Sequence, residues 1–214
     1  MKLYTYAQSS AAYRVRIALN LKDLKPDYEF VHLLKDGGQQ HAASYRALNP
    51  QELVPTLDVD GHHLGQSLAI IEYLDETHPN PPLFPKAPFN RARVRQIAYA
   101  IASDIHPVNN LRVRQYLKTV LNVSDEAGNV WYRHWIELGF NAIEAMLSGS
   151  RDTGRYCHGD QVTLADICLV PQVANARRFN VPLDTYPTIV RIDEALRKLP
   201  AFVAAAPEKQ ADAS

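Results

Sequence analysis

The sequence predicts two domains of different class, an α/β domain followed by an all-helical domain. Strand and helix signals alternate over about the first eighty residues, whereas strand signals disappear beyond a proline-rich stretch at 79–85. A chain of 214 residues is long enough to bury two separate cores. We therefore expect an α/β domain over residues 1–82, a linker over 83–89 and an all-helical domain over 90–214.

The first domain opens with a strand, a helix and a second strand. Residues 3–6 alternate as a buried strand does, and a helical apolar stripe begins just after Ser9 and Ser10. Residues 28–33 alternate again, and the glycine-containing loop at 35–40 ends this second strand. These signals predict a βαβ unit.

A hairpin and a helix complete the first domain. The segments 56–59 and 62–64 flank Asp60-Gly61, a dipeptide that supplies the positive φ angles of a tight turn between antiparallel strands. Ser67 then precedes a helix. Its buried face should consist of Ile70, Ile71 and Leu74.

The remaining residues carry helical periodicity. Residues 90–120 read as a helix that Pro107 should bend or interrupt, because proline removes a backbone hydrogen bond. Ser124 should cap the start of another helix. We expect the apolar stripe of that helix to consist of Trp131, Trp135, Leu138 and Ala142.

Two further helices follow. Thr163 and Asp166 have the spacing of a capping box just before the apolar run 167–170, which predicts a buried helix. A last helix should stop at Pro200, and we expect the end of the chain after Pro207 to fray.

The composition excludes several classes of protein. Lysine plus arginine and aspartate plus glutamate both number 23, so no net positive charge favours nucleic acid or a membrane as a partner. No segment approaches the roughly 20 apolar residues that span a bilayer, and the start lacks an apolar signal core. The two cysteines, Cys157 and Cys168, should be buried free thiols. We expect a cytoplasmic protein without a metal site, since the histidines show no ligand spacing.

Two helix N-termini in the first domain are candidate anion sites. Ser9 and Ser10 stand where four backbone N–H groups are unpaired and the helix dipole is positive, and Ser67 stands at a similar start. Between them, Val54-Pro55 enters a strand; a cis bond there would turn the Val54 backbone outward, toward an extended peptide. The alternative is that the serines only cap their helices.

Several motifs, in order along the whole chain, resemble the zeta class of glutathione transferases. They lie at 9–19, 35–40, 49–57, 66–74, 104–112 and 175–179. The resemblance implies a thioredoxin-like glutathione-binding domain followed by an all-helical substrate-binding domain, in a homodimer. It also implies glutathione-dependent cis–trans isomerisation of maleylacetoacetate to fumarylacetoacetate by reversible addition of the thiolate, in the breakdown of tyrosine-type compounds.

The same resemblance assigns the site residues. Ser9 and Ser10 are the expected catalytic residues. The expected glutathione-binding residues are Ser9, Ser10, Ala11, Gln40, Val54, Gln66, Ser67, His106 and Asn110. The expected residues for the dicarboxylic acid substrate are Arg178, Arg112 and Leu111. An arginine suits a carboxylate because its planar guanidinium donates two parallel hydrogen bonds, although a solvated helix face is the alternative for both arginines.

Two departures from the family pattern leave the substrate open. Ala11 stands where many members have cysteine, so glutathione must supply the active-site sulfur, and Gln8 stands where arginine is frequent. Maleylpyruvate is therefore an alternative substrate, and a general glutathione transferase or a non-catalytic glutathione-binding module are alternative functions. A serine hydrolase is disfavoured, because residues 65–69 lack the last glycine of a nucleophile elbow.

Overall fold

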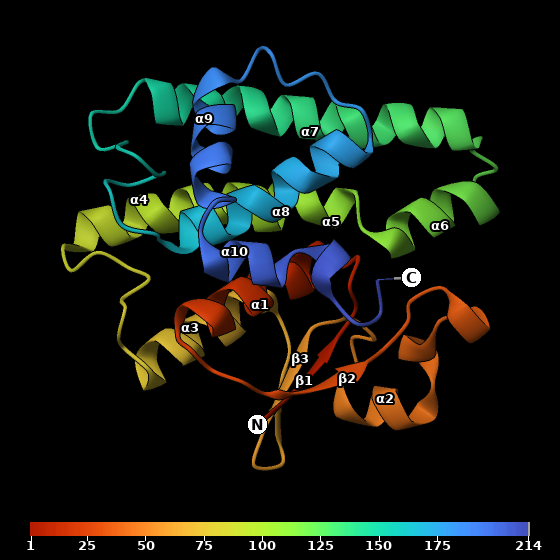
Figure 1. The fold of residues 1–214 in the computed structure, drawn as a ribbon. Coiled ribbons are helices and arrows are strands. Elements are labelled where there is room, and N and C mark those ends of the chain that lie inside the picture. The colour runs from red at the N-terminus through yellow and green to blue at the C-terminus, as the bar shows by residue number, and fades with distance from the viewer. Residues whose placement is uncertain (214) are drawn as a thin grey trace. The chain divides into compact units, whose positions relative to one another are not determined.

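The computed structural model of the chain describes residues 1–213, which fall into two compact units (Figure 1). The first unit combines Met1–Pro82 with the C-terminal segment that begins at Lys198, and the second spans Leu83–Arg197. The C-terminal segment thus groups with the α/β unit, whereas the division expected from the sequence assigned it to the helical domain.

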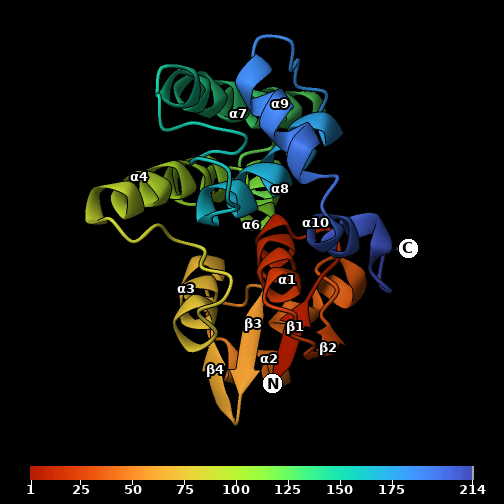
Figure 2. The ribbon, with the colours of Figure 1, turned by 60° about the vertical axis from the view of Figure 1, so that its left-hand side comes forward.

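The first unit contains one mixed sheet in the order β2-β1-β3-β4 (Figure 2). Its strands are β1 (Lys2–Thr5), β2 (Asp27–Phe30), β3 (Thr56–Val59) and β4 (His62–Leu64). β1 pairs in parallel with β2, and the helix α1 (Ser10–Leu21) connects these two strands in the sequence. β3 runs antiparallel to both β1 and β4. The predicted order of βαβ followed by a hairpin and a helix is confirmed.

The second strand ends three residues earlier than the sequence pattern suggests. After Phe30 the chain turns into a loop, in which the His32 backbone N–H donates to the Gln39 side chain and the Gln39 N–H donates to the His32 carbonyl. This loop contains two short 3₁₀ segments, Lys35–Gly37 and Gln39–His41, and leads into α2 (Ala43–Leu48).

Helices cover α1 within the first unit. Both α3 (Ser67–Thr77) and α10 (Pro200–Ala205) pack against it. The core consists of fully buried apolar side chains such as Leu3, Ile17, Leu57, Ile70 and Ile71. Ser67 begins its helix, as predicted.

A buried arginine joins the C-terminal segment to the start of the chain. The Arg16 guanidinium donates to the Ala205 carbonyl at 3.0 Å, to the Ala7 carbonyl at 3.1 Å and to the Thr5 hydroxyl at 3.1 Å. The Ala7 N–H in turn donates to the Asp212 carboxylate at 2.9 Å. The expected fraying after Pro207 is therefore wrong up to residue 213, because these polar contacts and a short 3₁₀ helix at Pro207–Lys209 order the segment.

The second unit is helical throughout its described elements. They are α4 (Pro88–Tyr99), a π-helical segment η3 (Ala100–Ile105), α5 (His106–Val108), α6 (Leu111–Thr119), α7 (Asp125–Ser148), α8 (Leu164–Arg178) and α9 (Pro187–Leu196). The helix expected over 90–120 is interrupted around Pro107, as predicted. The π-helical segment precedes the proline, and Asn110 caps a new helix after it.

The expected apolar stripe of α7 is wrong, because the buried face lies one or two positions further along the helix. Its buried side chains are Tyr132, Ile136, Phe140, Ile143 and Leu147, whereas Leu138 is 54% exposed. The two tryptophans border this face. Their rings contact edge to face, and the Trp131 indole N–H donates to the Val108 carbonyl at 2.9 Å. Large amphipathic side chains of this kind favour the edge of a core over its centre.

The capping box at the start of α8 forms as predicted. The backbone N–H and the hydroxyl of Thr163 both donate to the Asp166 carboxylate, at 2.8 and 2.9 Å, and the Cys157 N–H donates to its other oxygen at 2.8 Å. Cys157 and Cys168 are buried free thiols, which confirms that expectation. Among residues 1–213, no helix combines the length and apolar character needed to cross a membrane.

Candidate functional site

The N-terminus of α1 presents the hydroxyl of Ser9, at the positive end of the helix dipole. Ser9 is the N-cap, and its Oγ accepts a hydrogen bond from the Ala12 N–H at 3.2 Å, which leaves the hydroxyl proton able to donate elsewhere. Ser10 is the first helical residue and is buried, while Ser9 and Ala11 are half-buried. The start of this helix therefore suits an anion such as a thiolate.

The N-terminus of α3 lies in the same unit and is tied to α1. Arg14, one helical turn after Ser10, donates to the buried Ser67 hydroxyl at 3.4 Å. Gln66 precedes the helix with a φ of +65°, in the left-handed region that residues other than glycine seldom adopt, and its amide donates to the Gln51 side chain at 2.9 Å. Such an unfavourable backbone conformation often accompanies a functional site.

The peptide bond between Val54 and Pro55 is cis, and the Val54 side chain is buried. Val54 leads into β3, which pairs with β1. The isomer that the sequence left undetermined is thereby established.

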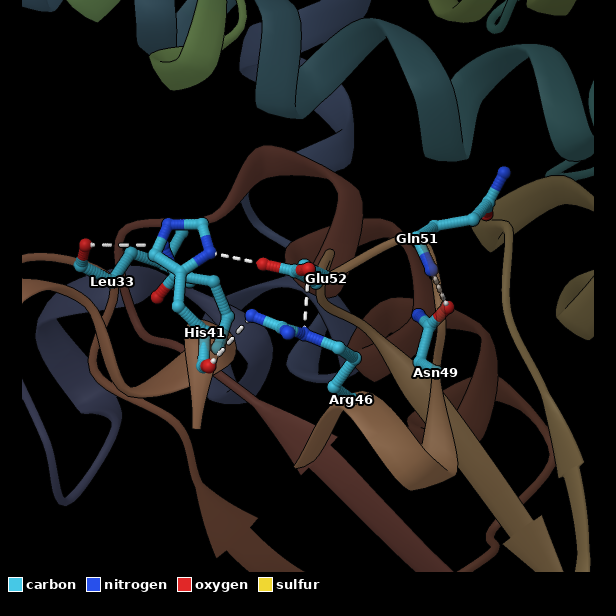
Figure 3. A network of polar contacts seen from close by, with 7 residues as sticks. Leu33, His41, Arg46, Asn49, Gln51 and Glu52 are labelled. Carbon is cyan, nitrogen blue, oxygen red and sulfur yellow. Dashed lines mark hydrogen bonds and ion pairs between the residues drawn. The ribbon is translucent and has the colours of Figure 1, made fainter. Parts of the chain in front are cut away.

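A polar network joins the 35–42 loop to the segment before Val54 (Figure 3). His41 Nδ1 contacts one carboxylate oxygen of Glu52, and Arg46 Nε lies 2.9 Å from the other. The hydrogen bond from His41 is the main cause that lowers the pKa of Glu52, and the Arg46 charge lowers it further. Glu52 therefore fastens the loop to the chain just before the cis bond.

Gln40 occupies the centre of this loop. Its side chain is buried, and its amide nitrogen lies within hydrogen-bond distance of the Leu33 carbonyl, at 3.4 Å, and of His41 Nε2, at 3.0 Å. Its buried Oε1 has no hydrogen-bond partner within the described residues. Because a buried polar atom without a partner is costly, this oxygen suits a ligand with an N–H donor.

The predicted site residues of the second unit belong to three helices, α5, α6 and α8. His106 begins α5, and Asn110 caps α6 by accepting from the Arg112 N–H at 3.1 Å. Leu111 is half-buried and Arg112 is exposed. Arg178 lies in the last turn of α8, with its guanidinium carbon 5.8 Å from the centre of the Phe179 ring.

One arginine beside this group was not identified from the sequence. Tyr132 and Phe179 stack with their ring centres 3.6 Å apart, and the Arg114 guanidinium carbon lies 5.4 Å and 4.9 Å from those centres. Burial raises the pKa of Tyr132 to about 12, although the charges of Arg114 and Arg178 lower it in part. The phenol is therefore neutral at physiological pH. The only sequence signal was the position of Arg114, one helical turn after the cap Asn110.

A cavity of about 440 Å³ in the second unit is lined by residues that include Phe89, Arg93, Ile97, Met146 and Asp152. None of the predicted site residues lines it, so it lends no support to the predicted chemistry. Within residues 1–213, no three His, Cys, Asp or Glu side chains are grouped in a way that could hold a metal ion.

Known proteins identify the family. Residues 3–82 match the family described as "Glutathione S-transferase, N-terminal domain". Over 212 residues the chain is 54% identical to the "Probable maleylacetoacetate isomerase" of Vibrio cholerae, covering 99% of this chain and 97% of that protein. It is 46% identical to a maleylpyruvate isomerase, described as a bacterial glutathione S-transferase in the zeta class, whose holo structure matches with a TM-score of 0.97 over 100% of both chains. The chain belongs to the zeta class of glutathione S-transferases.

A further solved structure resembles this zeta-class transferase. The maleylacetoacetate isomerase of Anaeromyxobacter dehalogenans is 41% identical, with a TM-score of 0.87 over 100% of this chain and 97% of that one. That enzyme holds dicarboxyethyl glutathione and citrate in its active site. The predicted fold, a thioredoxin-like domain with a helical glutathione-transferase domain, is confirmed by these matches.

The predicted site residues of this zeta-class transferase divide between its two units. The first unit contains Ser9, Ser10, Ala11, Gln40, Val54, Gln66 and Ser67. The second unit contains His106, Asn110, Leu111, Arg112 and Arg178. Their individual roles stay predictions, which the experiments below address.

Replacing Glu52 with glutamine should raise the KM for glutathione about two- to fivefold, in keeping with the loss of exposed ion pairs, and should change kcat less. The uncharged amide cannot form the ion pairs to His41 and Arg46, so the loop around Gln40 would be held less firmly. Steady-state kinetics with varied glutathione would measure this effect. Asp58→Asn, which alters a 3.6 Å contact with His63 in the hairpin, is a matched control. An unchanged KM in the Glu52 variant would contradict the role of the network.

Proposed function

We propose that this zeta-class transferase is a glutathione-dependent cis–trans isomerase that converts maleylacetoacetate to fumarylacetoacetate. The observation that carries the proposal is the Ser9 hydroxyl at the N-terminus of α1, whose oxygen accepts from the Ala12 N–H and whose proton is available to donate. The family membership and the relatives named as isomerases support it. By its chemistry this step belongs to the breakdown of tyrosine-type aromatic compounds.

The residues present fit glutathione. The buried Oε1 of Gln40 requires a donor, and the α1 N-terminus favours a thiolate. We assign the thiol end of the peptide to Ser9 and Ser10, beside Ala11, and its γ-glutamyl carboxylate to Gln66 and Ser67. The remaining glutathione contacts are assigned to Gln40, Val54, His106 and Asn110.

The chemistry divides between the bound peptide and the protein. When bound, glutathione supplies a thiolate that adds reversibly to the double bond, so that rotation about the resulting single bond becomes possible. Ser9 and the helix N-terminus lower the pKa of the thiol by stabilising its anion. Neighbouring donors stabilise the negative charge that develops on the substrate oxygen. No protein nucleophile is required.

The second unit supplies residues for the dicarboxylic acid. Arg178 is assigned to a substrate carboxylate, because a guanidinium can donate two parallel hydrogen bonds to it. Arg112 is a second candidate, and Leu111 contributes an apolar contact. The dicarboxyethyl group bound in the Anaeromyxobacter enzyme is consistent with a site for two carboxylates.

Maleylpyruvate is the second candidate substrate. The structure that matches this chain over its full length with a TM-score of 0.97 is a maleylpyruvate isomerase. Gln8 is exposed and stands where the family often has arginine. Its uncharged side chain cannot pair with a carboxylate, so other residues must determine which of the two acids is the substrate. A homodimer and a cytoplasmic location are further proposals that rest on the family resemblance.

The proposal is tested by following the loss of enol absorbance of maleylacetoacetate and of maleylpyruvate, each with and without glutathione. We expect turnover that depends strictly on glutathione, with the larger kcat/KM for maleylacetoacetate. A larger kcat/KM for maleylpyruvate would establish the second candidate. Binding of glutathione without turnover of either acid would contradict both and favour a conjugating or binding role.

A further inference from the structure

Arg114 lies beside the Tyr132–Phe179 stack and not above it. The guanidinium carbon is at similar distances from the two ring centres, 5.4 Å and 4.9 Å, while those centres are 3.6 Å apart. If the guanidinium lay above the outer face of Phe179, its distance to the Tyr132 ring centre would exceed its distance to the Phe179 ring centre by nearly 3.6 Å. The guanidinium therefore lies at the side of the stack, where it contacts both rings.

The aromatic contact leaves the charge of Arg114 largely uncompensated. A cation–π contact is only weakly stabilising and carries no negative charge to neutralise the guanidinium. Within residues 1–213, no carboxylate forms a salt bridge with Arg114. The acid that it influences is Asp125, whose pKa it helps to lower, but Asp125 is held by Lys118 at 2.7 and 2.9 Å.

Two guanidiniums thus share one aromatic pair. Arg114 projects from α6 and Arg178 from the end of α8, and both lie within 6 Å of the Phe179 ring centre. Both charges also act on the buried Tyr132. Arg112 is two residues before Arg114 on the same helix, which places it on the opposite side of α6. Arg114 is therefore better placed than Arg112 to act together with Arg178.

We propose that Arg114 is a specificity-determining residue whose guanidinium binds a carboxylate of the dicarboxylic acid, alongside the one bound by Arg178. This inference rests on the proposed function, and it assigns the second carboxylate contact to a residue that the sequence pattern did not indicate. The aromatic pair lies beside the Arg114 guanidinium and limits the positions that its planar donor group can take. Holding the donor group in place lowers the entropy cost of binding an anion.

Arg114→Met tests the proposal, because methionine keeps an unbranched apolar side chain and removes all five donors. We expect the KM for the dicarboxylic substrate to rise about tenfold or more, with the KM for glutathione unchanged within about twofold. Arg114→Lys should recover part of the loss, because it restores the charge without the planar fork. Lys118→Met removes the same charge from the same helix and should leave both KM values unchanged.

A binding experiment keeps the inference separate from the isomerase proposal. Succinate is a dicarboxylate that cannot isomerise, and butyrate is a monocarboxylate of equal chain length. Titration of each into the protein with glutathione present, followed by NMR, should show that the wild type prefers succinate and that Arg114→Met loses this preference. Unchanged succinate binding in Arg114→Met would overturn the inference, whether or not the wild type isomerises either acid. If the wild type turned over neither acid but Arg114→Met still lost the preference for succinate, the proposed function would be contradicted and the inference about Arg114 would stand.

Discussion

Replacing Ser9 with alanine should lower isomerase turnover about 100-fold, the loss typical of removing one hydrogen-bond donor to a developing or stabilised anion. In the protein the Ser9 oxygen already accepts from the Ala12 N–H, so its proton remains able to donate to a thiolate. Alanine would leave only the helix dipole and the backbone N–H groups to stabilise that anion. The pKa of bound glutathione should therefore rise.

The ultraviolet absorbance of the thiolate, measured against pH in the complex with glutathione, would report this pKa directly. Ser124→Ala is a matched control, because Ser124 caps α7 in the same way, accepting from the Ala127 N–H at 3.2 Å. Both variants should lose about 1 kcal/mol of stability through the lost cap, but only the Ser9 variant should lose turnover. Ser9→Thr, which keeps a hydroxyl, should retain most of it. Unchanged turnover in Ser9→Ala would indicate that Ser10, and not Ser9, stabilises the thiolate.

Replacing Arg16 with methionine should cause the largest loss of stability in the first unit, about 3–5 kcal/mol. The side chain is 1% exposed, and its guanidinium donates to the carbonyls of Tyr6, Ala7 and Ala205 as well as to a hydroxyl. Burial lowers the pKa of Arg16 to about 10, so the group remains charged near neutral pH. Methionine would leave these buried acceptors without donors, and each unpaired acceptor carries a desolvation cost.

Thermal unfolding would measure the effect, with an expected fall in Tm on the order of 10 °C. Arg191→Met is the control, because Arg191 also donates to two carbonyls, of Gly154 and Arg155, but is exposed and should cost far less. A similar Tm for the two variants would refute the idea that Arg16 joins the C-terminal segment to the first unit. Cleavage by protease near Lys198 should increase only in the Arg16 variant.

Features that depend on a few neighbouring residues could be predicted from the sequence. The Ser9 cap, the turn at Asp60-Gly61 and the capping box of Thr163 with Asp166 are each specified by local backbone hydrogen bonding. The interruption around Pro107 follows from the missing N–H of proline. In each case the physical cause lies within a few residues of its effect.

Features that depend on distant contacts could not be predicted. The buried face of α7 is displaced from the tryptophans because packing in the second unit, and not residue size, selects Tyr132 and its helical neighbours. Arg114 is unremarkable in sequence, and its position becomes informative only when Phe179 stacks on Tyr132. The loop around Gln40 likewise depends on Glu52, which is eleven residues beyond His41.

The return of the C-terminal segment to the first unit also bears on how the protein is made. Residues 1–82 leave the ribosome well before residues 198–213. The helix α1 therefore cannot pack against α10 until the entire helical unit has been synthesised. During that interval Arg16 lacks its Ala205 acceptor, and the nascent α/β unit carries an uncovered helix face. We expect the first unit to complete its folding only after residues 198–213 have left the ribosome, and a fragment that stops at residue 82 to be aggregation-prone.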